Sequence, residues 1–378
     1  MQRREFMTGS SACLLLSAMG CSPFSASSAR YLISTASDFK GDHFVVASTL
    51  DGRLVSQTPI PQRGHETLPI PQQPNRVLVL ARRPDRLAFV VDILRGEMVA
   101  QFSAQEHRHF YGHAVFSAGG EWLYTSENDY LNERGVIVVR DASNYRVVAE
   151  YDSGGIGPHE IKFLPDQIHL AVANGGIHTH PDWPRLKLNV DTMQPNLAIL
   201  NTDTGAITQR YTPPHHQQSI RHLDVNAAGD IFVGIQSQGK WQNQQPLVYV
   251  QKGNKPLQAF AAPRSDWQAM HRYTSSITCG DGYLVVTSPR GNSLTLWDTH
   301  NLQLIKRITL KDAAGIASIN NEIFVSSGLG TIFKSTIFKS TILKSTILKG
   351  AILKSSAQHM EHHAQFANLR FDNHMTLA

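Results

Sequence analysis

The chain is poor in cysteine and has no long apolar run. It has 378 residues and three cysteines. Cys13 and Cys21 lie near the N-terminus and Cys279 is the only cysteine of the body, so no internal disulfide forms if Cys21 is acylated or removed. The apolar stretch 7–20 is too short to span a membrane.

The body of the chain also lacks a large excess of positive or negative charge. The formal net charge is +5. Arg3, Arg4 and Glu5 contribute +1, and five lysines between Lys334 and Lys354 contribute +5, which leaves about −1 for the rest. A nearly neutral body has no electrostatic footprint for nucleic acid, so we expect no nucleic-acid partner.

Sequence motifs of the common enzyme classes are absent too. We find no nucleophile elbow, zinc-protease helix, phosphate loop or Cys-X-X-Cys-His haem site. Cys279 stands beside a glycine near a turn, which is typical of a small packed residue. These absences favour a binding protein over an enzyme and leave the question of catalysis open.

The N-terminus resembles an export signal. Arg3-Arg4-Glu5-Phe6-Met7 followed by the short apolar run is similar to a twin-arginine signal peptide. Cys21 follows Ala18-Met19-Gly20, which resembles a lipobox and makes Cys21 a candidate lipidation site. We expect residues 1–29 to be signal and linker. The mature protein would then be periplasmic, soluble or lipid-anchored, with no other membrane contact.

What the chain does contain is a repeat. A histidine opens an apolar stretch six times, at His65, His113, His159, His222, His271 and His374. The first five are separated by 48, 46, 63 and 49 residues, and the long interval holds an insertion at about 174–195. Repetition at such a period is the signature of stacked units. If each histidine opens the innermost strand of a blade, the imidazoles converge on one channel mouth.

Short β-branched runs between turns predict the strands of each unit. One unit reads as His113–Ser117, Glu121–Ser126, Gly135–Asp141 and Tyr145–Tyr151, and the same order recurs at Asn196–Asn201, Ile207–Tyr211, Ser293–Asp298 and Leu302–Ile308. The first unit has only Arg30–Ala36, His43–Ser48 and Arg53–Gln57, and Asp372–Ala378 supplies its inner strand. We therefore predict an all-β, seven-bladed β-propeller over residues 30–378, monomeric and closed by its two chain ends.

Two segments depart from the repeat. His271 stands further from its second strand than His113, His159 and His222 do, which indicates a loop position. Residues 331–355 repeat a pentapeptide, TIFKS and its variants, with a period that fits neither strand nor helix. We interpret this tract as a low-complexity expansion between the last two strands of the seventh blade.

Loops that enter the inner strands, and loops that join second and third strands, open on the same face of a propeller. Arg82, Arg83, Tyr111, Gln236, Gln238 and Arg290 belong to this face, together with Glu127 and the insertion that carries His178 and His180. Neutral imidazole binds iron, copper, zinc or nickel, and carboxylates complete the shell. We expect this face to bind a transition metal or a metal-bearing partner. The candidate ligands are His65, His113, His159, His222, His374, His178 and His180, with Glu66, Glu127 and Glu160 beside them.

Other interpretations of the histidines remain open. A Gly-His pair before an inner strand is structural in many WD40-like propellers, and Gly112-His113 resembles that arrangement. The protein would then be a non-catalytic interaction scaffold. A polar channel mouth for an organic or anionic ligand is a third interpretation. A metal-dependent lyase or oxidoreductase that uses Glu127 or Glu160 is a fourth.

Several stretches carry a resemblance to a known family: residues 112–117, 156–160, 173–181, 219–224 and 372–374. The chain resembles a family of exported bacterial seven-bladed β-propellers that is known only as a domain of unknown function. The match covers nearly all of residues 30–330 and the last few residues. Members are often encoded near imelysin-like and di-haem peroxidase-like proteins. This implies a periplasmic role in iron acquisition, with a periplasmic or membrane protein as partner.

Overall fold

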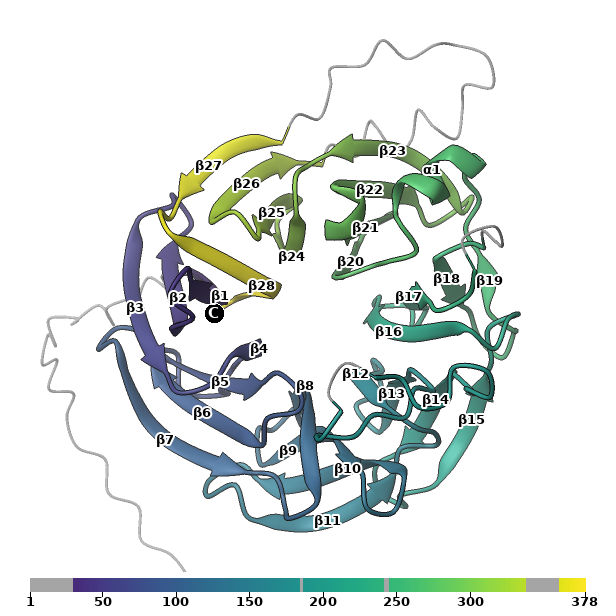
Figure 1. The fold of residues 1–378 in the computed structure, drawn as a ribbon, viewed down its shortest axis with the longest axis horizontal. Helices are drawn as coiled ribbons and strands as arrows, with labels where there is room; N and C mark the ends of the chain where they lie inside the picture. The colour runs from purple at the N-terminus through teal and green to yellow at the C-terminus, as the bar shows by residue number, and fades with distance from the viewer. Residues whose placement is uncertain (1–29, 184–185, 241–244, 338–359) are drawn as a thin grey trace, which may run out of the picture.

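The computed structural model describes residues 30–183, 186–240, 245–337 and 360–378. The signal, Cys21 and most of the pentapeptide tract lie outside these residues. Seven four-stranded antiparallel sheets stand in a ring, which confirms the predicted seven-bladed propeller (Figure 1). We use channel for the central region between the inner strands, which side chains enter. The first strand of each blade lies innermost and the fourth lies at the rim.

The strands of blades 1 to 4 follow in chain order, beginning with the blade that contains both chain ends. They are β28 (Leu369–Leu377), β1 (Tyr31–Asp38), β2 (His43–Thr49) and β3 (Leu54–Ile60); β4 (Gly64–Pro69), β5 (Arg76–Ala81), β6 (Leu87–Asp92) and β7 (Glu97–Ser103); β8 (Arg108–Phe116), β9 (Trp122–Asp129), β10 (Arg134–Asp141) and β11 (Val147–Asp152); β12 (Pro158–Phe163), β13 (His169–Asn174), β14 (Asn196–Asn201) and β15 (Ile207–Tyr211).

The last three blades contain the two short helical segments. Their elements are β16 (Gln218–Val225), β17 (Ile231–Ser237), β18 (Val248–Gln251) and β19 (Gln258–Ala259); α1 (Arg264–Ala269), β20 (Ile277–Gly280), β21 (Tyr283–Ser288), η1 (Pro289–Gly291), β22 (Ser293–Asp298) and β23 (Gln303–Thr309); β24 (Ala313–Ile319), β25 (Glu322–Ser327), β26 (Thr331–Thr336) and β27 (Glu361–Gln365). The first copy of the pentapeptide forms most of β26, the third strand of blade 7.

The hydrophobic core lies between neighbouring blades. In β5 the residues Val77–Ala81 are all fully buried, because blades pack against both faces of the second strand. Rim strands such as β7 stay largely exposed. Trp297 of β22 is fully buried and stacks on Trp267 of α1, with ring centroids 5.0 Å apart. Each blade therefore depends on its neighbours for burial.

The two chain ends pair with each other, as predicted. β28 and β1 run antiparallel, and Leu32 is opposite Leu377. Tyr31 N–H donates to the Ala378 carbonyl at 2.7 Å, and Ala378 N–H donates back at 3.0 Å. This pairing supplies blade 1 with its inner strand and removes the edge that β1 would otherwise expose.

His271 lies outside the inner strand, as its spacing indicates. It is exposed in the turn after α1, and the inner strand of blade 6 begins six residues later, at Ile277. Five histidines, not six, therefore reach the channel. The inner strand of blade 7, β24, carries no histidine.

Candidate metal centre in the central channel

Five histidines enter the channel from the inner strands of five blades. Each inner strand has a β-bulge or register shift at or beside its histidine, and a bulge redirects the side chain that it displaces. The histidines are His65 of β4, His113 of β8, His159 of β12, His222 of β16 and His374 of β28. All five are buried, between 0 and 8% exposed.

His113 stands at the middle of the cluster. Its ring centroid lies 4.6 Å from those of His159 and His374, 4.9 Å from that of His65 and 5.9 Å from that of His222. These are contact distances between rings. Five of the histidines that the sequence analysis placed at one channel mouth therefore form a single group, which we call the histidine cluster.

Every member of the cluster has a buried ring nitrogen without a hydrogen-bond partner in the structure. These atoms are Nε2 of His65, His113, His222 and His374 and Nδ1 of His159, whereas Nδ1 of His65 and of His113 each face a carboxylate. A buried polar atom that lacks a partner costs about 1–3 kcal/mol, so native proteins rarely leave several together. A structural role for these histidines would use such atoms in hydrogen bonds. Their convergence instead points to a ligand.

Three sets of side chains in this region bring their ligand atoms within 4.8 Å of one another. They are His65, His113 and His159; His113, His222 and His374; and Glu66, His113 and Glu160. His113 belongs to all three. Nitrogens bound to one ion at 2.0–2.1 Å lie at most about 4 Å apart, so small ring rotations would bring each set into coordination.

Carboxylates from the preceding blade orient three of the imidazoles. Nδ1 of His113 lies 3.2 Å from Oε2 of Glu66, and Nδ1 of His222 lies 3.2 Å from Oε2 of Glu160. The same two oxygens accept the backbone N–H groups of Ala114 and Leu223, each at 3.1 Å. A carboxylate at Nδ1 fixes the ring and leaves Nε2 available, as in histidine–metal sites.

Asp372 plays the corresponding part for His65. Its Oδ1 lies 3.5 Å from Nδ1 of His65. The same oxygen accepts a hydrogen bond from Arg82 at 2.8 Å, and Oδ2 accepts one from Arg63 at 2.6 Å. Burial raises the pKa of Asp372, but Arg82, His65 and Arg63 outweigh it and hold the pKa far below the usual range. Sequence analysis missed Asp372 as a site residue, although it stands two residues before His374 in the closing strand.

Burial keeps the imidazoles neutral. It lowers the pKa of His113 to about 4 and that of His374 to about 3, and it holds the pKa of His65, His159 and His222 well below 6.5. Neutral imidazole is the form that binds a metal. Burial also raises the pKa of Glu66 and Glu160.

The two histidines of the insertion lie apart from the cluster. Nε2 of His178 is buried without a partner, but this residue lines a separate cavity with Glu133 and Asn189. His180 packs against the rings of Tyr130 and Trp183, at 5.1 and 5.3 Å. Neither belongs to a set of neighbouring metal-ligating atoms among the described residues.

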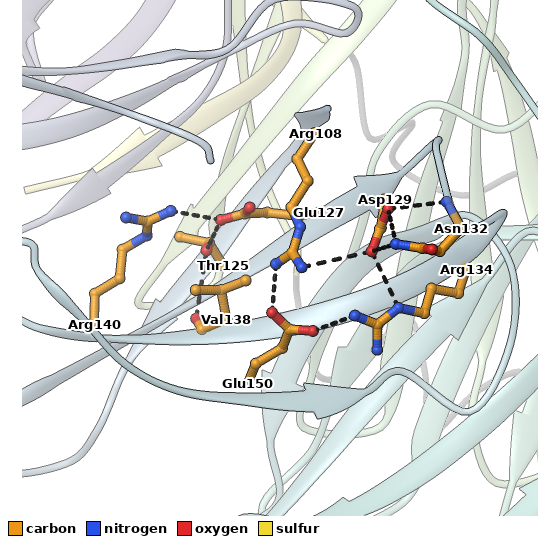
Figure 2. Close-up of polar contacts among 9 residues, drawn as sticks. All are labelled: Arg108, Thr125, Glu127, Asp129, Asn132, Arg134, Val138, Arg140 and Glu150. Carbon is orange, nitrogen blue, oxygen red and sulfur yellow. Dashed lines mark hydrogen bonds and ion pairs between the residues drawn. The ribbon is translucent and has the colours of Figure 1, made fainter. Parts of the chain in front are cut away.

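Glu127 is a structural residue of blade 3. β9 extends to Asp129, so Glu127 lies in a strand and is fully buried. It accepts hydrogen bonds from Arg140 at 2.7 Å and from Thr125 at 2.8 Å (Figure 2). Figure 2 also shows the neighbouring network that joins Arg108, Asp129, Asn132, Arg134 and Glu150. With its carboxylate held by Arg140, Glu127 does not join the histidine cluster.

Comparison with known proteins places the chain in a family. No curated protein matches it. Within the described residues, no helix is long and apolar enough to cross a membrane. A family model described as "Protein of unknown function (DUF1513)" matches residues 58–378, which include all five channel histidines and their carboxylate partners. The chain therefore belongs to this family of unknown function, in agreement with the resemblance seen in its sequence.

Proposed function

We propose that this protein binds one transition-metal ion in the histidine cluster. The observation that supports it best is the convergence of unpartnered, buried ring nitrogens from five blades around His113. Imidazole nitrogens with a nearby carboxylate suit iron, copper or zinc. Glu66 and Glu160 lie close enough to supply negative charge to such an ion.

The proposal includes a cellular setting that comes from the sequence. A twin-arginine signal would export the folded chain to the periplasm, soluble or anchored through Cys21. There it would serve iron acquisition or handling together with a periplasmic or membrane protein. Arg140 holds the carboxylate of Glu127 in blade 3, away from the histidine cluster. Glu160 is engaged by Nδ1 of His222 and the N–H of Leu223, which favours a binding role over catalysis.

Metal content tests the binding role. The mature chain is purified from the periplasm without a histidine tag, analysed for metals, stripped, and titrated with Fe²⁺, Cu²⁺ and Zn²⁺. We expect one ion per chain, retained in His300→Gln, an exposed histidine outside the channel, and lost in His113→Gln. Circular dichroism checks that both variants keep their β structure. No uptake by the wild type, or equal uptake by His113→Gln, would contradict the proposal.

Export is tested separately. Changing both Arg3 and Arg4 to lysine should keep the protein in the cytoplasm, because a twin-arginine signal requires the arginine pair. Cell fractionation with an antibody against the chain measures this. Equal periplasmic amounts of the variant and the wild type would contradict the proposed route.

A further inference from the structure

A cavity of ≈ 140 Å³ opens at one end of the channel, and cationic side chains surround it. His65, His159 and His222 line its inner side. The cations come from four blades and the segments between them: Arg82, Arg83, Lys187, Arg221, Arg272 and Arg290. No carboxylate lines this cavity among the residues that the structure describes. We call it the cationic cavity.

Arg221 is the buried member of the set. It is 4% exposed, and it is the residue of β16 that the bulge leaves without a partner in β17. Its guanidinium packs against Gly175, where an added Cβ would lie 3.2 Å from Cζ. Nε of Arg221 has no hydrogen-bond partner, and no described carboxylate pairs with this side chain. A buried, uncompensated charge is costly, which indicates a counterion from outside the chain.

The neighbouring cations add to the positive potential. Burial lowers the pKa of Lys187, and the charges of Arg221, Arg290, Arg83 and Arg272 lower it further. Lys187 and Arg290 are exposed, and Cζ of Arg290 lies 4.2 Å from the centroid of the Tyr273 ring. Charges of one sign at a concave site concentrate ligands of the opposite sign.

Two other cations near the histidine cluster have carboxylate partners. Arg82, on the wall of the same cavity, lies 2.8 Å from Asp372. Lys162, which lines a different cavity with Glu66 and Glu160, pairs with Asp224 at 2.6 Å. Arg221 differs from both because no carboxylate of the described residues pairs with it.

We propose that the cationic cavity binds a small oxyanion with two or more negative charges, a polycarboxylate or a phosphate, through Arg221, Arg83 and Arg290. Guanidinium groups bind carboxylate and phosphate by paired hydrogen bonds. A space of ≈ 140 Å³ accepts such an anion but is too small for a nucleic-acid backbone. Because His65, His159 and His222 share this cavity, the anion would also reach a metal in the cluster. That last point rests on the proposed function.

Such an arrangement would resolve an electrostatic conflict. A bare metal cation beside six cationic residues is repelled, whereas a metal that carries an anionic ligand is attracted. We infer that the metal enters from this side as its anionic chelate, with the imidazoles and the anion sharing its coordination sphere.

The test uses the metal-free mature chain in low-salt Tris chloride, titrated calorimetrically. The probes are tricarballylate, succinate and inorganic phosphate, with acetate as the monovalent comparison. We expect one saturable site for at least one multivalent anion, bound about tenfold more tightly than acetate and weakened by added salt. Whichever of tricarballylate and phosphate binds more tightly identifies the anion as a polycarboxylate or a phosphate. No saturable binding of any multivalent probe would overturn the proposal.

Variants locate the site. Arg221→Met should weaken binding about tenfold or more, and it should raise Tm in the absence of anion because it removes an uncompensated buried charge. Arg290→Gln, an exposed change that spares the fold, should weaken binding a few-fold. Lys311→Gln is the matched control, since Lys311 is exposed on a loop that does not line the cavity. Unchanged affinity in both arginine variants would overturn the proposal.

The same titration on the metal-loaded chain separates this proposal from the proposed function. Anion binding to the metal-free chain supports the cationic cavity even if the histidine cluster takes up no metal. Metal uptake without anion binding would overturn the cationic cavity and leave the metal site standing. Tighter anion binding after metal loading would support the shared coordination sphere, and unchanged affinity would overturn it.

Discussion

Glu66 of blade 2 reaches across to blade 3, where its Oε2 lies 3.2 Å from Nδ1 of His113 and accepts the N–H of Ala114. Glu160 of blade 4 has the same relation to His222 of blade 5. One carboxylate thus joins two blades and orients an imidazole. The ring of blades is therefore coupled to the geometry of the histidine cluster.

This relation predicts the effect of Glu66→Gln. The amide oxygen can still accept the Ala114 N–H, so the fold should persist, but the negative charge at Nδ1 of His113 is lost. Loss of such a partner typically weakens metal binding about 10- to 100-fold. Competition with a chelator of known affinity measures it. Glu97→Gln, on the exposed rim strand β7, serves as control, and an equal affinity in both variants would contradict the prediction.

The pKa values predict how stability depends on pH. The unfolded chain takes up protons on its histidines below about pH 6.5, whereas burial holds the folded pKa of His113 at about 4 and of His374 at about 3. The free energy of unfolding should therefore fall as the pH drops from about 6.5 to 4. Between pH 7 and 5 each of these two histidines should lower it by roughly 2 kcal/mol.

Two carboxylates act in the opposite direction. Burial raises the folded pKa of Glu66 and Glu160 above 4.5, so each adds stability as the pH falls through its folded value. Urea unfolding of the metal-free chain at several pH values measures the balance. The loss of stability on acidification should be smaller by roughly 2 kcal/mol in His113→Gln than in the wild type, and an equal loss in both would count against a neutral buried His113.

Glu127→Gln should separate stability from metal binding. The change leaves the buried Arg140 without its countercharge, which should cost about 3 kcal/mol in the free energy of unfolding. Metal content should not change, because Glu127 lies outside the histidine cluster. Glu121→Gln, exposed in the same blade, should change stability by less than about 0.5 kcal/mol. Loss of metal in a folded Glu127→Gln variant would contradict this assignment.

Closure of the ring depends on the apolar side of β28. Phe371 is 5% exposed and packs on Phe366, with centroids 5.6 Å apart. Phe371→Ala should lower the free energy of unfolding by about 3–5 kcal/mol. Leu131→Ala, at a residue that is 64% exposed, should have little effect. Urea unfolding followed by tryptophan fluorescence measures both, and similar costs would argue against a stabilising role for the closing strand.

The propeller was predictable because its signals are local and repeated. The histidine spacing set the blade period, and the boundaries of β14, β15 and β22 agree with the sequence. The closing strand was predictable from His374, since blade 1 lacked an inner strand and the last residues matched one. These inferences need only the regular spacing of strands and turns.

The parts of the site that were not predicted from the sequence depend on strand register and on contacts between blades. The sequence placed Glu127 in a loop, but β9 continues through it and pairs it with Val136, and its side chain meets Arg140 further along β10, which no local pattern reveals. The sequence analysis did not single out Arg221, which the bulge in β16 leaves without a partner in β17. The loop position of His271 was predictable from its greater distance to the second strand, and α1 occupies the segment before it.

The position of the bound metal is the sharpest test of the proposed function. Crystals of the metal-loaded mature chain are measured at the absorption edge of the bound ion, and the anomalous difference map shows where the ion lies. We predict one peak about 2 Å from imidazole nitrogens of the histidine cluster, with His113 among its ligands. A stoichiometric ion whose only peak lies elsewhere, at His178 and His180 or on the surface, would contradict the central claim.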